Sequence, residues 1–184
     1  MATRDLVRIA LFAAVIAALG LAPKFDLPVA GGVPITAQNL GVMLAGVFLG
    51  PRKGALAVAL FLLCVAVGMP LLSGGRGGLA PFFGPGGGFI LGFVPAAFTV
   101  GFVMTQLRDL PLFAGAFIAS VIGGIFVDYA LGIPYLAWKA NMNLAQAAFG
   151  SALFLPGDLI KAVIAGLVAQ TVHRSLPKSI DGRV

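Results

Sequence analysis

The sequence predicts an all-α membrane protein, a single domain over residues 1–184 that forms a compact bundle of six transmembrane helices. The chain is 60% hydrophobic and only 10% charged, whereas soluble domains carry about 25% charged residues. Its mean hydropathy is +1.06, and its apolar runs approach the ~20 residues that a helix needs to cross a bilayer. These runs are too long and too continuously apolar for the alternating strands of an outer-membrane barrel.

Each apolar run is expected to form one helix. The second and third runs are short for spans, and only Pro51, Arg52 and Lys53 separate them, which predicts a tight helical hairpin. A glycine-rich loop, residues 73–78, lies between the third and fourth runs on the outer face. The stretch around Trp138 is expected to be a long outer loop. The expected helices cover residues 6–22, 36–50, 54–69, 87–107, 112–131 and 156–173.

The distribution of basic residues predicts that both termini lie inside the cell. Basic residues collect on the cytoplasmic side of a membrane protein. With both termini inside, eight lysines and arginines are cytoplasmic and four are outside, so the net charge of +6 needs no nucleic-acid partner. The inner set is Arg4, Arg8, Arg52, Lys53, Arg108, Arg174, Lys178 and Arg183, and the outer set is Lys24, Arg76, Lys139 and Lys161. We therefore expect a multi-pass protein of the cytoplasmic (inner) membrane of a prokaryote.

The glycine-rich loop is the first candidate for a ligand site. Arg76 lies between two glycine pairs that include Gly75. Backbone N–H groups and one guanidinium can together bind an anion, although an ordinary surface loop has the same composition. The apolar, aromatic stretch that follows predicts that the loop folds back onto the bundle as a lid.

Asp158 and Lys161 are the second candidate. An ionisable group at the centre of a bilayer costs ~3 kcal/mol or more, so it usually faces a cavity. A spacing of three places both side chains on one helix face. Either both side chains line a ligand pocket, or Asp158 is an N-cap or first-turn acid of the helix and Lys161 is its ion partner. Asp128 either faces the same cavity or, as the favoured interpretation, pairs with Lys139 or Lys161.

Other polar and aromatic residues complete the predicted site. Gln38 and Asn39 begin the second helix, where they either cap it or donate hydrogen bonds to a ligand. Phe89 is expected to supply an apolar wall, and Gly75 and Gly87 allow close backbone approach to a ligand. Small residues on the first helix allow close contact with other helices, either within the bundle or with another membrane protein. These residues are Ala10, Ala13, Ala14, Ala17 and Ala18.

Several classes of function find little support in the sequence. The chain has no phosphate-binding glycine motif followed by Lys and Ser or Thr, which argues against ATP hydrolysis. Its single cysteine, Cys64, and single histidine, His173, stand apart from any cluster that would bind a metal. We therefore expect no catalytic residues, no metal site and no cofactor.

In this order and spacing, several individually weak motifs resemble the BioY family over nearly the whole chain. That family comprises the biotin-specific substrate-binding subunits (S-components) of energy-coupling factor (ECF) transporters. Two positions depart from its pattern, since Gly86 and Phe89 stand where relatives commonly have threonine and tyrosine. The motifs are Pro-Ile-Thr-Ala-Gln at 34–38, the stretch 44–52, Gly-Gly-Arg-Gly-Gly at 74–78, Gly-Pro at 84–85 with Gly-Gly at 87–88, and Gly-Asp-x-x-Lys at 157–161.

The resemblance implies high-affinity binding of biotin for uptake, energised by partners. Asp158 would accept the ureido N–H groups, and Arg76 or Lys161 would meet the carboxylate. The implied partners are a transmembrane coupling subunit, which would dock on the first-helix alanines, and two ABC-type ATPases. A standalone, homo-oligomeric carrier of small solutes, an intramembrane lipid-modifying enzyme and an S-component for another vitamin remain as alternatives.

Overall fold

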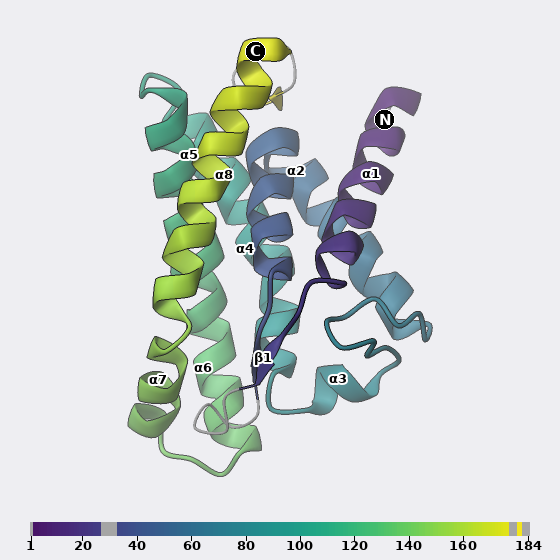
Figure 1. Cartoon of the computed structure of the whole chain (residues 1–184), viewed down its shortest axis with the longest axis vertical. Coiled ribbons are helices and arrows are strands. Elements are labelled where there is room, and N and C mark those ends of the chain that lie inside the picture. Colours follow the sequence, from purple (N-terminus) through teal and green to yellow (C-terminus); the bar gives the residue numbers. More distant parts are fainter. Residues whose placement is uncertain (1, 27–32, 177–179, 182–184) are drawn as a thin grey trace.

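The computed structural model describes residues 2–26, 33–176 and 180–181, and most of them are helical (Figure 1). This confirms the predicted all-α class. Two short strands, β1 and β2, pair antiparallel with Phe25 opposite Ile35. The elements in chain order are α1 (Thr3–Leu19), β1 (Phe25–Asp26), β2 (Pro34–Ile35), α2 (Gln38–Ala66), α3 (Ala80–Phe83), α4 (Gly87–Gln106), α5 (Leu112–Val121), η2 (Ile122–Val127), α6 (Asp128–Lys139), α7 (Leu144–Ala152) and α8 (Leu155–Ser175).

The described residues contain four helical stretches that are long and apolar enough to cross a membrane. They are Gln38–Ala66, Gly87–Gln106, Leu112–Lys139 and Leu155–Ser175. The helix α1 has 17 residues, slightly fewer than the ~20 that a perpendicular span needs. The chain is therefore a multi-pass membrane helix bundle.

The helix α2 folds back on itself at Gly50, as the sequence predicts for the hairpin. Gly50 has φ of 75° and ψ of −176°, which breaks the helix, and Pro51 follows. A Cβ on Gly54 would lie 2.9 Å from the carbonyl oxygen of Ala45. Nine residues of straight helix would separate these positions by roughly 13.5 Å, so the two arms of α2 pack side by side.

The expected outer loop around Trp138 is wrong, because this stretch is helical. The helices α5, η2 and α6 run without a break, and α7 follows after a short turn. Gly132 and Pro134 weaken a helix in water, but membrane helices tolerate them. Here Gly132 lets α6 approach the ring of Phe89, where a Cβ would collide. Tertiary packing therefore overrides the local helix-breaking signal.

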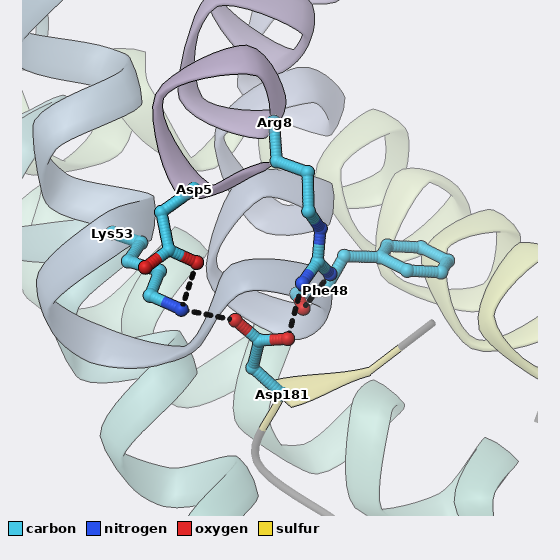
Figure 2. Close-up of polar contacts among 5 residues, drawn as sticks. All are labelled: Asp5, Arg8, Phe48, Lys53 and Asp181. Carbon is cyan, nitrogen blue, oxygen red and sulfur yellow. Dashed lines mark hydrogen bonds and ion pairs between the residues drawn. The ribbon is translucent and has the colours of Figure 1, made fainter. Parts of the chain in front are cut away.

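Both termini lie at the same end of the bundle (Figure 1), where four charged side chains form what we call the terminal ion cluster. Lys53 Nζ lies 2.6 Å from Asp5 Oδ1 and 2.8 Å from Asp181 Oδ2, and Arg8 pairs with the other oxygen of Asp181 (Figure 2). The neighbouring Ile180 is fully buried among side chains of the core. The cluster thus ties the C-terminal segment to α1 and α2.

Candidate functional site

Two neighbouring cavities lie away from the termini, near the β-strands and α3. The larger, which we call the Arg76 cavity, has a volume of about 550 Å³ and is walled by the 72–77 loop, α3 and the start of α4. The smaller, the Asp158 cavity, has a volume of about 60 Å³ and is walled by residues of α2, α4, α6 and α8. Five residues line both cavities: Val33, Pro34, Thr36, Phe89 and Phe93. The two cavities therefore adjoin.

Asp158 is the centre of the polar network in the smaller cavity. Its Oδ1 accepts hydrogen bonds from Lys161 Nζ at 2.7 Å and, at a longer 3.5 Å, from Asn39 Nδ2. Its Oδ2 accepts a hydrogen bond from the hydroxyl of Tyr129 at 2.6 Å. Asp158 is 4% exposed, so these partners offset the cost of burying its charge. The expected pairing of Asp158 with Lys161 is present, and both residues also line the cavity.

Asp128 also lines the Asp158 cavity, but the favoured expectation that it pairs with Lys139 or Lys161 is wrong. Its side chain makes no ion pair with either lysine, and its Oδ1 is buried without a hydrogen-bond partner among the described residues. Lys139 instead places its ammonium 4.3 Å from the centre of the Trp138 ring, a cation–π contact. Asp128 therefore brings a second buried carboxyl group to the cavity.

Arg76 lines the larger cavity from the glycine-rich loop. The loop closes through two backbone hydrogen bonds between Leu72 and Arg76, of 3.0 and 3.2 Å. Gly74, Gly75 and Gly78 have φ between 69° and 80°, which glycine adopts without strain. The guanidinium Nε donates to the Ser73 carbonyl at 3.2 Å. No carboxylate of the described residues pairs with this guanidinium, so an anion could occupy its remaining donors.

Gln38 neither caps α2 nor has a free polar group, although it lines the larger cavity. Its Nε2 donates to the carbonyls of Ile16 at 3.3 Å and Leu71 at 3.0 Å. Its Oε1 accepts from the backbone N–H and the hydroxyl of Ser73, at 3.0 and 3.2 Å. Gln38 therefore anchors the start of the glycine-rich loop to the bundle.

Asn39 uses its amide nitrogen within the protein. Its Nδ2 donates to the carbonyl of Gly124 at 3.0 Å and to Asp158, while its Oδ1 is buried with no partner among the described residues. The capping alternative for Asn39 is therefore wrong, because α2 has no side-chain cap. The amide faces the Asp158 cavity instead.

The predicted aromatic wall is present, whereas one predicted glycine lies elsewhere. Phe89 is 8% exposed, lines both cavities, and packs edge-to-face against Tyr129 and Phe154 with ring centres 5.9 and 6.3 Å apart. Gly75 lines the larger cavity. Gly87 lines neither cavity, and a Cβ there would collide with the Phe82 carbonyl. Gly87 thus allows α3 to pack against α4.

The sequence reasoning missed Tyr129, whose hydroxyl binds Asp158, and the apolar side chains of Phe93 and Phe154. Its place next to Asp128 within an apolar run could have identified Tyr129, because a buried tyrosine hydroxyl needs a hydrogen-bond partner. The phenylalanines carry no such signal, because the chain contains 15 of them.

The alanines of α1 divide between two faces. Ala13 is buried and Ala17 is partly buried, so these two belong to the side of α1 that packs in the bundle. Ala10, Ala14 and Ala18 are exposed. Their spacing of four places them along one stripe of the helix. One side of α1 therefore packs its alanines within the bundle, and another side presents small side chains outward.

The fold and the two cavities define the class: a multi-pass membrane protein with a polar site away from the termini of its helix bundle. The chain belongs to the BioY family, whose model matches residues 1–178. It is 51% identical to a biotin transporter BioY of Rhizobium etli, covering 96% of this chain and 97% of that one. It is 46% identical to the biotin transporter BioY of Rhodobacter capsulatus, covering 98% of both chains.

A solved structure has the same fold. The crystal structure of the S-component for biotin from an ECF-type ABC transporter superposes with a TM-score of 0.86 at 31% identity, over 95% of each chain. The predicted family is therefore confirmed. Because the relatives are named as transporters, the expectation that the chain is not an enzyme is also confirmed.

Proposed function

We propose that this chain is the biotin-binding subunit of an ECF-type transporter and captures biotin for uptake into the cell. The observation that carries the proposal is the pair of adjoining cavities with different polar groups. One cavity contains a cation, Arg76, and the other contains a cluster rich in hydrogen-bond acceptors around Asp158. The names of the family's relatives support biotin as the ligand.

Biotin has chemical groups that suit each part of this site. Its ureido ring presents two N–H donors, which the carboxylate-rich Asp158 cavity accepts. Its thiophane ring and alkyl chain pack against Phe89 and Phe93, which line both cavities. Apolar burial of this kind supplies roughly 25 cal/mol for each Å² removed from water. The valerate carboxylate extends into the Arg76 cavity.

Arg76 rather than Lys161 binds the carboxylate in this proposal. Lys161 already pairs with Asp158 at 2.7 Å, which balances its charge. Arg76 lines the larger cavity without a carboxylate partner in the described part of the chain. A guanidinium also offers the two parallel N–H donors that a carboxylate accepts in a bidentate pair.

The two departures from the family pattern fit a site that relies on other polar groups. Gly86 lines the Arg76 cavity, and Phe89 lines both cavities. Neither side chain offers a hydroxyl group. Tyr129 supplies the hydroxyl that meets Asp158, so Phe89 contributes an apolar ring surface alone.

The proposed arrangement in the membrane has six spans in the inner membrane, with both termini in the cytoplasm. The two arms of α2, separated at Gly50, count as two spans, and α1 counts as one. The two termini lie at one end (Figure 1). The Arg76 loop and the cavities then face outward, where biotin arrives. Lys178 and Arg183, part of the inner basic set, lie outside the described residues.

The exposed alanine stripe of α1 is the proposed docking surface for a transmembrane coupling subunit that works with two ATPases. Small side chains allow helices to approach closely, and Ala10, Ala14 and Ala18 are exposed. We expect Ala14→Phe to reduce co-purification with the coupling subunit by at least about tenfold while biotin binding stays unchanged. Ala148→Phe, at an exposed alanine of α7, is the matched control. Undiminished assembly of Ala14→Phe would contradict the docking proposal.

Titration of the detergent-purified protein with biotin by calorimetry tests the binding function directly. Tight, saturable binding is expected, and no binding to well-folded protein would overturn the assignment. Uptake of labelled biotin by cells with and without the ATPases tests the energising partners. Full-rate uptake without them would favour a standalone carrier, whose oligomeric mass can be measured in detergent.

A further inference from the structure

A groove of about 850 Å³ lies between α1 and α8 near the chain termini, and no described residue lines both this groove and one of the two cavities. Both helices pack against α2, which supplies the floor of the groove through Leu44 and Phe48, 8% and 6% exposed. Apart from Arg4 and Arg8, every described residue that lines the groove is apolar. This feature, which we call the α1–α8 groove, therefore combines an apolar surface with two cationic side chains.

The groove follows the axes of the helices that form it. Its lining residues on α1 extend from Arg4 to Val15, and those along α8 are Val168, Val172 and Leu176, whose spacing of four places them on one face. At 1.5 Å for each residue, the α1 wall is roughly 16 Å long. The hydrocarbon core of a bilayer is about 30 Å thick. The groove therefore has about the depth of one leaflet, on the side where the termini lie.

The cationic side chains lie together at the terminal end of the groove. Arg8 is already engaged, because it pairs with Asp181 and donates to the Phe48 carbonyl at 3.2 Å (Figure 2). The two cations and two carboxylates of the terminal ion cluster balance one another. Arg4 is exposed and forms no ion pair with another described residue. Arg4 therefore gives this end of the groove a net positive charge.

An amphiphile with an anionic head matches the groove better than a protein helix does. Membrane helices approach one another most closely at small side chains, whereas the apolar part of the groove is lined by leucine, valine and phenylalanine. The exposed stripe of Ala10, Ala14 and Ala18 is centred roughly a quarter turn away around α1. Basic pockets between helices on the cytoplasmic side bind anionic lipid headgroups, and a guanidinium can donate two parallel hydrogen bonds to a phosphate.

We propose that the α1–α8 groove binds an anionic phospholipid of the inner leaflet, with its phosphate beside Arg4 and one acyl chain along the apolar part. The proposal uses the orientation with cytoplasmic termini and none of the groups that are proposed to bind biotin. Any lipid-facing surface contacts acyl chains. Preference for an anionic headgroup is therefore the property that distinguishes this site from the rest of the surface.

Arg4→Ala tests the contact with the headgroup. Native mass spectrometry of the detergent-purified protein measures binding of phosphatidylglycerol and of phosphatidylcholine with the same acyl chains. The parent should bind phosphatidylglycerol at least about fivefold more tightly, the factor that one basic residue contributes near an anionic lipid, and Arg4→Ala should lose most of this preference. Arg174→Ala, at an exposed arginine in the last turn of α8 that does not line the groove, is the matched control. Equal affinity of the parent for the two lipids, or an unchanged preference in Arg4→Ala, would overturn the proposal.

Leu11→Trp tests the apolar part of the groove. Leu11 lines the groove and is 57% exposed, so an indole there occupies the path of the acyl chain without entering the core. Affinity for phosphatidylglycerol should fall about tenfold. Leu6→Trp, at a leucine of α1 that is 55% exposed and does not line the groove, should bind the lipid like the parent.

Melting curves in detergent without added lipid establish that each variant is folded. Parent-like binding of phosphatidylglycerol by folded Leu11→Trp would overturn the proposal. Loss of assembly with the coupling subunit, or of self-association, without a change in lipid binding would also overturn it, because the groove would then be a protein interface. Biotin affinity should stay unchanged in Arg4→Ala and Leu11→Trp, so the outcome for the lipid is separate from the outcome for the proposed function.

Discussion

The two ends of the bundle contain polar clusters that differ in how completely their groups are paired. In the terminal ion cluster every carboxylate meets a cation, and the side chains are 17–29% exposed (Figure 2). In the Asp158 cavity the side chains of the central ion pair are 14% and 6% exposed. There, two buried oxygens, on Asn39 and Asp128, have no partner among the described residues.

This difference separates a structural cluster from one suited to binding. A fully paired, partly exposed cluster contributes modestly to stability and has no need of a ligand. A buried cluster with unmet acceptors is destabilising unless something else satisfies it. Proteins accept such local costs at functional sites. Substitutions at the two ends should therefore affect different measurements.

Asp158→Asn should have the largest effect on binding. The change removes a negative charge from the cavity that is proposed to accept the ureido N–H groups, and it also leaves Lys161 without its ion partner, which lowers stability by about 3–5 kcal/mol. We expect biotin affinity measured by calorimetry to fall at least about 100-fold. Asp109→Asn, at an exposed aspartate between α4 and α5, is the matched control. Parent-like affinity of Asp158→Asn would place the ligand elsewhere.

Arg76→Ala should have the next largest effect. Loss of a charge-assisted hydrogen bond costs about 1.5–3 kcal/mol, so affinity for biotin should fall about 10- to 100-fold. Affinity for biotin amide, which lacks the carboxylate, should change little. Arg108→Ala is a close control, because Arg108 Nε donates to the Thr105 carbonyl at 3.3 Å, the same local bond that Arg76 makes with Ser73. An equal loss for biotin and its amide would contradict a contact between Arg76 and the carboxylate.

Asp181→Asn should have the smallest effect, and on stability alone. Loss of its bonds to Lys53 and Arg8 should lower the free energy of unfolding by about 1 kcal/mol, as for partly exposed ion pairs. Thermal melting in detergent measures this change, while calorimetry should find unchanged biotin affinity. A large loss of biotin affinity would show that the two ends are coupled.

The pH dependence of the same cluster follows from the pKa of Asp181. Burial opposes ionisation of Asp181, but hydrogen bonds from Lys53 and Arg8 outweigh it and hold the pKa below its ordinary value. The stabilisation is therefore present above the pKa of the unfolded chain and is lost as the pH falls below roughly 4. Melting curves of the parent and Asp181→Asn should converge in acid. A constant difference between them down to pH 2 would contradict this assignment.

Much of the fold could be predicted, but the extent of several helices could not. Composition and run length indicated the membrane helices, and Pro51 beside Gly50 indicated the hairpin. The stretch around Trp138 was expected to be a long loop, whereas it is helical and includes Gly132 and Pro134, which are poor helix formers. Gly132 packs closely against Phe89 in this helix, and contacts so distant in sequence have no local signature.

Local spacing was sufficient wherever the partners lie within one helical turn. Asp158 and Lys161 are three residues apart, so helix geometry alone places them together, and the structure has them 2.7 Å apart. The membrane class and the resemblance to the family were likewise readable from composition and motif order. These properties depend on residues that are close together in the sequence, or on the composition of the whole chain.

Only the packed bundle decided which polar groups remain unpaired. Asn39, Asp128 and Asp158 come from three helices, and their partners depend on how those helices meet. The sequence left open whether Gln38 binds a ligand and whether Asp128 forms an ion pair. Every polar group of the Gln38 side chain forms hydrogen bonds, whereas Asp128 Oδ1 has no hydrogen-bond partner among the described residues. Hydrogen-bond satisfaction depends on distances across the core, and those distances exist only once the helices have packed.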